Sequence, residues 1–240
     1  MLNFVTSIHE EGLRTYGLRM LNSVAKYWDK DSLQLTCFYH DFDINIYNIP
    51  DVPHIKFRNL NDIQDMIDYR NNFKKYDGTS DDGYDWRTDA IKWCHKVFGM
   101  TELAFEMAEH SVKPGWLIWL DADTLTTKRF SENSIKEYLH EKCSIVHLGR
   151  TDIDYSETSF LAFNLNRENP LQFLADLRGA YISGEILCYR EWHDGFITER
   201  LLNIYKAHGT NVHNLTPKVY GLDAFGQSPL SEYMLHYKGQ

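Results

Sequence analysis

The sequence predicts an α/β fold in which a mainly parallel central sheet carries helices on both faces. Strand and helix patterns alternate through the first half of the 240-residue chain, as they do in parallel sheets. Residues Trp116–Leu120 form a continuous apolar run, which is typical of a strand buried on both faces. Because no repeat or low-complexity linker divides the chain, we expect a single domain over residues 1–240.

The first half is expected to alternate strands with helices. Apolar or alternating patterns predict strands at Leu2–Ile8, Leu33–Tyr39 and His54–Phe57. Helical spacing predicts helices over Leu13–Trp28 and over about Thr88–His110. A third helix is expected to begin at a capping box of Asn61 and Gln64 and to run to about Lys75. Residues 77–85 are acidic and rich in turn formers without apolar periodicity, so they predict a loop.

The second half mixes strands with less regularly spaced helices. Strands are predicted at Cys143–Leu148, Ser159–Leu165 and Asn211–Leu215. Asn169 before Pro170 predicts a helix start, with Asn as the cap and Pro as the first helical residue. Another helix is expected from about Asp194 to His208, where Gly209 ends it.

Composition excludes several classes of protein. The 34 Asp and Glu outnumber the 25 Lys and Arg, and the net charge of −9 argues against non-specific binding to nucleic acid or anionic membrane. No apolar run approaches the roughly 18 to 20 residues of a membrane span, and the first residues do not resemble a signal peptide. The four cysteines are widely spaced without a Cys-x-x-Cys motif, so we expect reduced thiols and a cytoplasmic protein.

Two carboxylates end the most apolar strand of the chain, in the segment Asp121-Ala122-Asp123. Ligands of open α/β sheets bind just outside the carboxyl ends of the strands. Two carboxylates at that place can hold a hard divalent cation, which in turn can hold phosphate oxygens. A structural pair of strand-end acids is the alternative. Three other Asp-x-Asp pairs occur, and they are Asp29/Asp31, Asp41/Asp43 and Asp152/Asp154. Asp41/Asp43 competes most directly, because it also follows a predicted strand.

The order of several short motifs resembles that of A-type-fold glycosyltransferases. These motifs are Phe4-Val5-Thr6-Ser7-Ile8, Trp86-Arg87-Thr88-Asp89-Ala90 with Lys96-Val97-Phe98, Trp119-Leu120-Asp121-Ala122-Asp123-Thr124 and Leu235-His236-Tyr237-Lys238-Gly239. The resemblance implies a single Rossmann-like domain of this type. Residues 1–125 would be its nucleotide-sugar half, and residues 126–240 its acceptor half with a C-terminal metal and diphosphate tail.

The resemblance also implies roles for individual residues. Asp121, Asp123 and His236 would hold the metal, and Ala122 would leave space for the ligand. The end of the first strand would meet the nucleotide, the middle segment would contact the sugar nucleotide, and the tail would meet the diphosphate. The residues implied for these contacts are Thr6, Ser7, Ile8, Arg87, Asp89, Lys96, Lys238 and Gly239.

The implied activity is transfer of a hexose-type sugar from a nucleoside-diphosphate sugar, UDP by resemblance, to a hydroxyl acceptor. A mixed set of oxygen and nitrogen ligands suits Mn²⁺, or Mg²⁺ with added waters. Metal and Lys238 would neutralise the charge that develops on the departing diphosphate. No nucleic acid is expected among the partners.

Two further carboxylates are candidates for the acceptor side. Asp194 could bind or deprotonate the acceptor hydroxyl, with Trp192 as a sugar platform, although an N-cap role would also explain it. Glu157, just before a predicted strand, is the second candidate, whereas His193 is expected to be structural. The acidic loop 77–85 is either a lid over the nucleotide or a solvated connection.

Three other classes remain as alternatives. Haloacid dehalogenase-type phosphatases also place Asp-x-Asp after an apolar strand, but they continue with Thr or Val where this chain has Leu125. A nucleotidyltransferase would need a Gly-rich basic loop, whereas Ser7–Gly12 is acidic. A non-catalytic carbohydrate-binding protein would suit the aromatic content of 14%, but it would leave the strand-end acids and His236 without a role.

Overall fold

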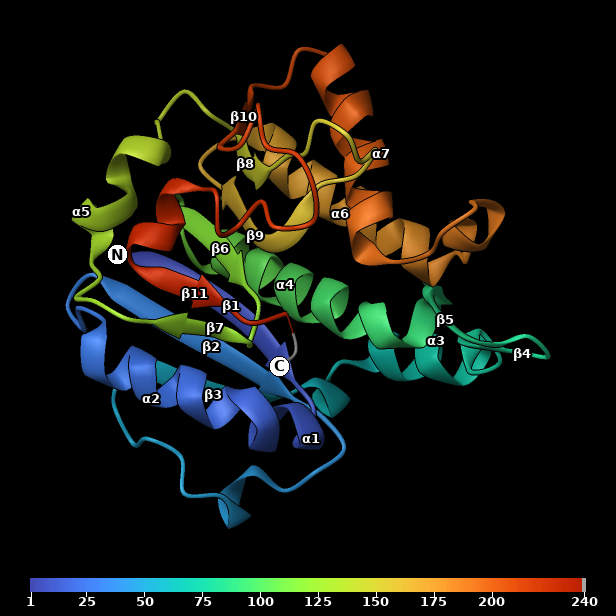
Figure 1. Cartoon of the computed structure of the whole chain (residues 1–240), viewed down its shortest axis with the longest axis horizontal. Coiled ribbons are helices and arrows are strands. Elements are labelled where there is room, and N and C mark those ends of the chain that lie inside the picture. The colour runs from blue at the N-terminus through green and yellow to red at the C-terminus, as the bar shows by residue number, and fades with distance from the viewer. Residues whose placement is uncertain (239–240) are drawn as a thin grey trace.

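A seven-stranded mixed sheet forms the centre of the computed structural model, which describes residues 1–238 (Figure 1). Its strand order is β10-β8-β9-β6-β1-β2-β3. Within residues 1–238, β9 alone runs antiparallel to its sheet neighbours. The strands are β1 (Leu2–Ile8), β2 (Leu33–Tyr39), β3 (Ile55–Asn59), β6 (Trp116–Leu120), β8 (Ile145–Leu148), β9 (Glu157–Asn164) and β10 (Val212–Asn214). The predicted α/β class with a mainly parallel sheet is confirmed.

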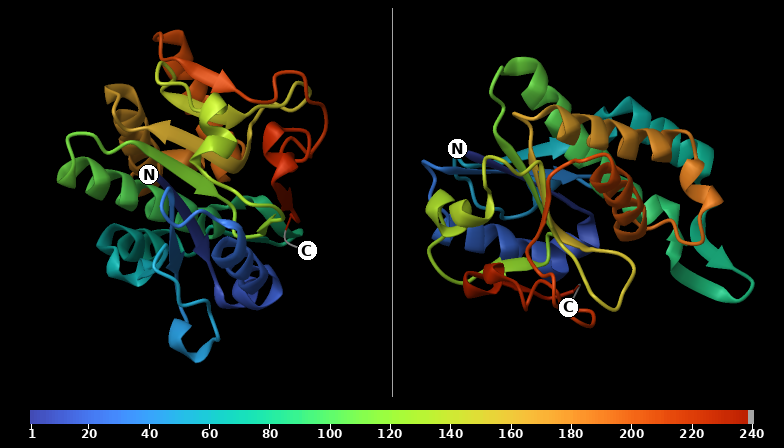
Figure 2. Two further views of the ribbon diagram at one scale, coloured as in Figure 1. Left: turned by 90° about the vertical axis from the view of Figure 1, so that its left-hand side faces the viewer. Right: turned by 90° about the horizontal axis from the view of Figure 1, so that it is seen from above.

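Helices cover both faces of this sheet (Figure 2). The α-helices are α1 (Glu10–Gly12), α2 (Leu18–Tyr27), α3 (Gln64–Phe73), α4 (Ala90–His110), α5 (Glu132–Ile135), α6 (Glu168–Ile182) and α7 (Asp194–Ala207). Short 3₁₀ turns lie at Ile44–Ile46, Leu60–Asp62, Lys136–Tyr138, Glu185–Cys188 and Pro229–Glu232. Side chains of α2 and α5 enter one hydrophobic core, and those of α3, α4, α6 and α7 enter the other.

Strand β6 shows why the chain adopts this layered arrangement. All five of its residues are buried. Trp116, Ile118 and Leu120 enter the core beside α2, while Leu117 and Trp119 enter the core beside α4. The period of two places alternate side chains on opposite faces, and each fully buried large apolar side chain contributes about 1.5–3 kcal/mol. The unbroken apolar run was therefore a correct sign of a central strand.

A second, two-stranded sheet was not predicted. Strand β7 (Thr124–Thr126) pairs antiparallel with β11 (Met234–His236), so that His236 faces Thr124 across the pair. The buried Ser23 and Trp28 of the α2 region hold β7 in place. Ser23 Oγ accepts from Thr126 N–H at 3.0 Å, and Trp28 Nε1 donates to Thr126 Oγ1 at 2.9 Å. This pairing returns the end of the described chain to the segment that follows β6.

The prediction of a loop over residues 77–85 was wrong, because most of this segment belongs to a hairpin of β4 (Asp77–Ser80) and β5 (Gly83–Asp89). Both strands are largely exposed, so the hairpin carries no alternating apolar pattern. Gly83 follows the turn with positive φ, and Gly78, at the irregular point of β4, also has positive φ. Figure 1 shows the hairpin projecting beyond the end of α4.

Three predicted helix starts need correction. The Asn61–Gln64 capping box does not form; Asn59 caps the 3₁₀ turn Leu60–Asp62 instead, and α3 follows Ile63. Helix α6 begins before Pro170, with Arg167 at the N-cap position. In α7 the cap is His193, whose ring accepts from Phe196 N–H at 3.3 Å, which leaves the Asp194 carboxylate for other contacts.

The predicted helix over Leu13–Trp28 is interrupted near its start. A π-helical turn at Leu13–Gly17 lies between α1 and α2. Cys37, Cys94 and Cys143 are buried thiols, as expected, whereas Cys188 is an exposed thiol. None of the helices within residues 1–238 has the length and apolar character needed to cross a membrane.

Candidate metal centre and its surroundings

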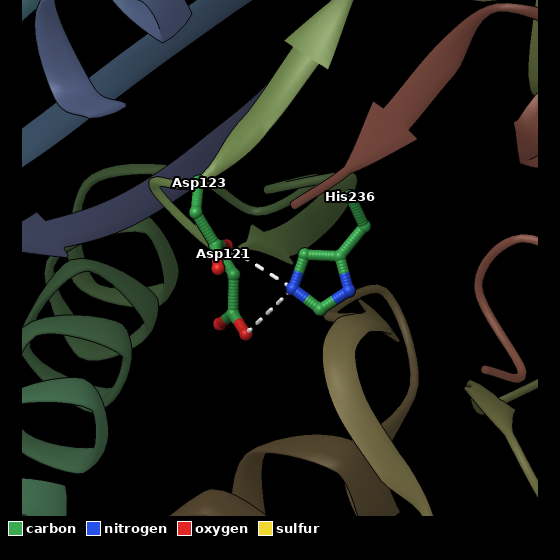
Figure 3. Close-up of side chains that lie close together, drawn as sticks. All are labelled: Asp121, Asp123 and His236. Atoms are coloured by element: carbon green, nitrogen blue, oxygen red, sulfur yellow. Dashed lines mark ion pairs between the residues drawn. The ribbon is translucent and has the colours of Figure 1, made fainter. Parts of the chain in front are cut away.

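Asp121, Asp123 and His236 meet at the carboxyl end of β6 (Figure 3). One ligand atom from each lies within 4.8 Å of those of the other two. His236 Nε2 is 3.1 Å from Asp123 Oδ1 and 3.8 Å from Asp121 Oδ2. Two carboxylates and an imidazole that point at one another form a donor set suited to a divalent cation such as Mn²⁺ or Mg²⁺.

Secondary structure from the middle of the chain and from its C-terminal part positions these three side chains. Asp121 and Asp123 flank the short turn between β6 and β7, where Thr124 N–H donates to the Asp121 carbonyl at 3.1 Å. His236 is the last residue of β11, which pairs with β7, and Tyr237 N–H donates to the Asp123 carbonyl at 3.1 Å. The triad therefore depends on the small sheet as much as on β6.

His236 is held as a charged group between carboxylates. Burial alone disfavours its imidazolium, but hydrogen bonds to Asp123 and Glu157 outweigh that effect and raise its pKa to about 10. A divalent cation would replace the proton on Nε2, because a His ligand must be unprotonated at the coordinating atom. In the metal-free protein, this proton holds the triad together.

Asp121 presents one oxygen to the triad and uses the other to anchor itself. Asp121 Oδ1 accepts from Lys96 Nζ at 3.1 Å and from Trp119 Nε1 at 2.6 Å, while Oδ2 faces His236. Desolvation by the surrounding protein raises the pKa of Asp121, and the positive charge of Lys96 opposes that rise. The fixed orientation leaves Oδ2 directed at the position a cation would take.

Lys96 of α4 joins Asp121 to Asp194. Its ammonium is buried, lies 2.8 Å from Asp194 Oδ2 and also donates to the Thr158 carbonyl. Burial would lower the pKa of Lys96, but the two carboxylates outweigh it and raise the pKa. Burial likewise opposes ionisation of Asp194, and Lys96 outweighs it, so the pKa of Asp194 is lowered. Thr158 Oγ1 completes the group by donating to Asp194 Oδ2 at 2.5 Å.

Glu157 lies behind His236 rather than in an open site. Its Oε1 accepts from His236 Nδ1 at 3.0 Å, and its Oε2 accepts from Ala224 and Phe225 N–H at 2.7 and 3.3 Å. Burial alone would raise the pKa of Glu157, but the bond to His236 and the charge of Lys238 lower it to about 2. These contacts of Glu157 fix the orientation of the imidazole.

Lys238 lies just after β11, next to this group. Its Nζ is 3.6 Å from Glu157 Oε1 and 3.7 Å from Asp223 Oδ1, and it donates to the Leu222 carbonyl. The side chain is partly exposed, so its ammonium can exchange these contacts for those of a ligand. Gly239, the other tail residue implied by the resemblance, lies outside the described residues.

The end of β1 lies beside β6 in the sheet, since Val5 pairs with Trp119. Of the three residues expected to meet the nucleotide, Thr6 and Ile8 are buried and Ser7 is partly exposed. Ala122, between the two acids, is also buried.

Within residues 1–238, the hydrogen bonds and ion pairs of Arg87 and Asp89 are made with residues other than Asp121, Asp123 and His236. Arg87 forms an ion pair with Asp85 within β5 at 2.9 Å. The Asp89 carboxylate caps α4 by accepting from Lys92 N–H at 2.8 Å, and it also accepts from Tyr84 Oη at 3.0 Å. Both residues lie in or next to the hairpin, and their roles toward a nucleotide stay predictions.

The same arrangement of elements occurs in a known glycosyltransferase structure. The crystal structure of mouse xyloside xylosyltransferase 1 in its apo form matches with a TM-score of 0.53 at 10% identity, over 89% of this chain and 84% of that one. The chain has the glycosyltransferase A-type fold. No protein-family model matches the sequence, and no curated protein matches it. The fold therefore rests on the structure, and the predicted A-type fold is confirmed.

Within the A-type fold, the other Asp-x-Asp pairs have local structural contacts. Asp41, in the competing pair, forms an ion pair with Arg70 at 2.6 Å and a hydrogen bond with His40 at 3.1 Å. Hydrogen bonds from Arg70 hold the pKa of Asp41 well below its usual range. Asp43 caps the 3₁₀ turn by accepting from Asn45 N–H at 3.0 Å. Among residues 1–238, only the Asp121/Asp123 pair belongs to a cluster suited to a metal ion.

Sequence reasoning missed several residues that shape the site. Trp119 was assigned only to the strand, yet its indole N–H fixes Asp121. Thr158 was given no role, and Ser159, whose Oγ lies 3.1 Å from Glu157 Oε1, was predicted only as the first residue of a strand. The expected platform residue Trp192 is partly buried, and its Nε1 donates to the Tyr189 carbonyl at 3.0 Å. Polar residues at the start of β9 were the available signal, because an otherwise apolar strand seldom begins with consecutive Glu, Thr and Ser.

Proposed function

We propose that the chain is a divalent-metal-dependent glycosyltransferase that moves a sugar from a nucleoside-diphosphate sugar to a hydroxyl acceptor. The observation that carries the proposal is the convergence of Asp121, Asp123 and His236 within 4.8 Å at the carboxyl end of β6. The A-type fold supports it. UDP is the nucleotide we favour, on the resemblance alone, and Mn²⁺ or Mg²⁺ the metal.

The triad residues fit the metal by chemistry and orientation. Asp121 Oδ2, Asp123 Oδ1 and His236 Nε2 would hold it, since these atoms already face one another. When bound, a divalent cation supplies the positive charge that neutralises a diphosphate leaving group as the anomeric C–O bond breaks.

The remaining residues position the ligands and add charge. Lys96 and Trp119 hold Asp121 in one orientation. Glu157 keeps the His236 proton on Nδ1 and so leaves Nε2 as the coordinating atom. Lys238 would exchange Leu222 and Asp223 for the diphosphate and add a point charge there.

Asp194 is our candidate for the acceptor side. The contacts of Asp194 with Lys96 and Thr158 engage the same oxygen, Oδ2. We assign the other oxygen, Oδ1, to the acceptor hydroxyl, which it would bind or deprotonate. Glu157, the second carboxylate expected on that side, is assigned to His236 instead because its two oxygens contact the imidazole and two backbone N–H groups.

Thermal denaturation with nucleoside diphosphates tests the proposal without knowledge of the acceptor. A ligand at 100 times its Kd stabilises the native state by about 2.7 kcal/mol, which raises the Tm of a chain this size by roughly 5–11 °C. UDP should raise the Tm with Mn²⁺ but not with EDTA.

Variant Asp123→Asn should fold with a lower ligand-free Tm, because His236 loses an ion-pair partner, and it should lose the metal-dependent shift. Asp43→Asn is the matched control, because Asp43 is exposed and an Asn can still cap its turn. An undiminished shift in Asp123→Asn would remove the metal role from this site. Phosphate release from phosphomonoesters without nucleotide-sugar turnover would favour a phosphatase.

A further inference from the structure

Three aromatic rings surround His193 at the start of α7. Trp86 comes from β5, Trp93 from the first turns of α4, and Tyr155 from the segment before β9. Their centroids lie 4.9, 6.2 and 4.6 Å from the His193 ring, respectively. Trp93 and Tyr155 are partly buried, whereas Trp86 leaves 41% of its surface exposed. Four separate chain segments thus build one aromatic cluster that is open on the Trp86 side.

Hydrogen bonds fix this cluster in place. Trp93 Nε1 donates to the Trp86 carbonyl at 2.8 Å, and Trp192 N–H donates to the Arg87 carbonyl at 2.7 Å. His193 is held through both ring nitrogens, since Nδ1 accepts from Phe196 N–H and Nε2 lies 2.9 Å from Glu191. Figure 1 shows β5 beside the segment that leads into α7. The exposed indole therefore sits on a preorganised support and not on a free hairpin.

Two elements connect the cluster to the metal centre. Trp93 precedes Lys96 by one turn of α4, so both side chains lie on the same face of that helix. His193 directly precedes Asp194, and Lys96 links Asp194 to Asp121. The order of contacts runs from the metal triad through Lys96 and Asp194 to the aromatic rings. Trp86 thus packs against His193, the residue directly before Asp194, which we assign to the acceptor.

We propose that Trp86, supported by Trp93 and Tyr155, is a binding platform for a pyranose ring of a carbohydrate acceptor. The proposal rests on the proposed glycosyltransferase function and names its acceptor class. The C–H face of a pyranose is apolar and stacks on an indole, while its hydroxyl groups need polar partners at the ring edge. Asp85 and Arg87 flank Trp86 in β5 and pair with each other, and Glu191 lies 2.9 Å from His193 of the cluster. An exposed indole with charged groups nearby suits a pyranose, which has an apolar face and a polar edge.

Saturation-transfer NMR on the full chain with UDP and Mg²⁺ tests this platform. The probes are methyl pyranosides of glucose, galactose, mannose and xylose. We expect saturation transfer to the ring protons of at least one of them in the unmodified protein. Trp86→Ala should bind that sugar roughly tenfold more weakly, and Trp86→Phe should retain most of the binding. Ile204→Ala is the control, because Ile204 is an exposed apolar residue of α7 that takes no part in the cluster.

The donor side gives an independent readout. The Tm shift caused by UDP with Mg²⁺ should be unchanged in Trp86→Ala, which also shows that this variant is folded. The platform would be overturned if Trp86→Ala bound the sugar as tightly as the unmodified protein, or if the unmodified protein bound no pyranoside. In either case, an intact UDP shift would leave the proposed function standing. Absence of a metal-dependent Tm shift with UDP and with every other nucleoside diphosphate in the unmodified protein would instead overturn the proposed function.

Discussion

Replacing Glu157 by Gln should weaken Mn²⁺ binding, although Glu157 is not itself placed as a metal ligand. Its carboxylate holds Nδ1 of His236 at 3.0 Å and so directs Nε2 toward the two aspartates. Groups that orient a ligating histidine in this way typically contribute 10- to 100-fold to metal affinity. That range corresponds to about 1.4–2.7 kcal/mol of binding free energy.

The contacts of Glu157 also explain why the amide is a poor replacement. The backbone N–H groups of Ala224 and Phe225 need an acceptor at one oxygen of the side chain, and His236 Nδ1–H needs one at the other. An amide supplies only one oxygen. Because the two backbone donors cannot change and the imidazole can, the amide NH₂ should face His236. Nδ1 then becomes an acceptor, and the neutral ring carries its proton on Nε2, the atom meant for the metal.

Isothermal titration with Mn²⁺ at neutral pH measures the effect directly. The matched control is Glu199→Gln, which makes the same chemical change at a carboxylate that accepts from Ser156 Oγ and does not contact His236. We expect the control to bind Mn²⁺ as tightly as the unmodified protein. A Kd for Glu157→Gln within twofold of the unmodified protein would show that His236 needs no orienting partner or does not bind the metal.

The metal-free protein offers two further tests. Lys96→Met should lower the free energy of unfolding by about 3–5 kcal/mol, because Asp121 and Asp194 would lose the cation between them. Urea denaturation measures this loss, and a value below about 1 kcal/mol would contradict the buried bridge. The pKa of His236 rises from 6.5 to about 10 on folding, so its contribution to stability is full below pH 6.5 and is lost as the pH rises toward 10. In EDTA, the Tm of the unmodified protein should fall more steeply over that range than the Tm of His236→Gln, and parallel curves would refute the assignment.

The predictable part of the fold follows from local patterns. Strands β1 and β2 have the predicted bounds because their apolar residues repeat with the period of a buried strand. The same reasoning found β6 and the two acids at its carboxyl end. The β4–β5 hairpin was missed because its strands bury almost nothing and so carry no periodic pattern.

The site divides in the same way between local and distant information. The sequence by itself determined that a central strand ends in two carboxylates, since a run of five apolar residues followed by Asp-x-Asp is visible without any neighbour. Only the tertiary structure decided which Asp pair matters. Asp41 is neutralised by Arg70 of α3, whereas Asp123 meets His236 through the β7–β11 pairing. Glu157, Lys96 and Trp86 acquire their positions from contacts between segments far apart in the chain. Periodicity records how a segment faces its own core, but which distant side chain arrives beside it depends on the packing of the whole fold.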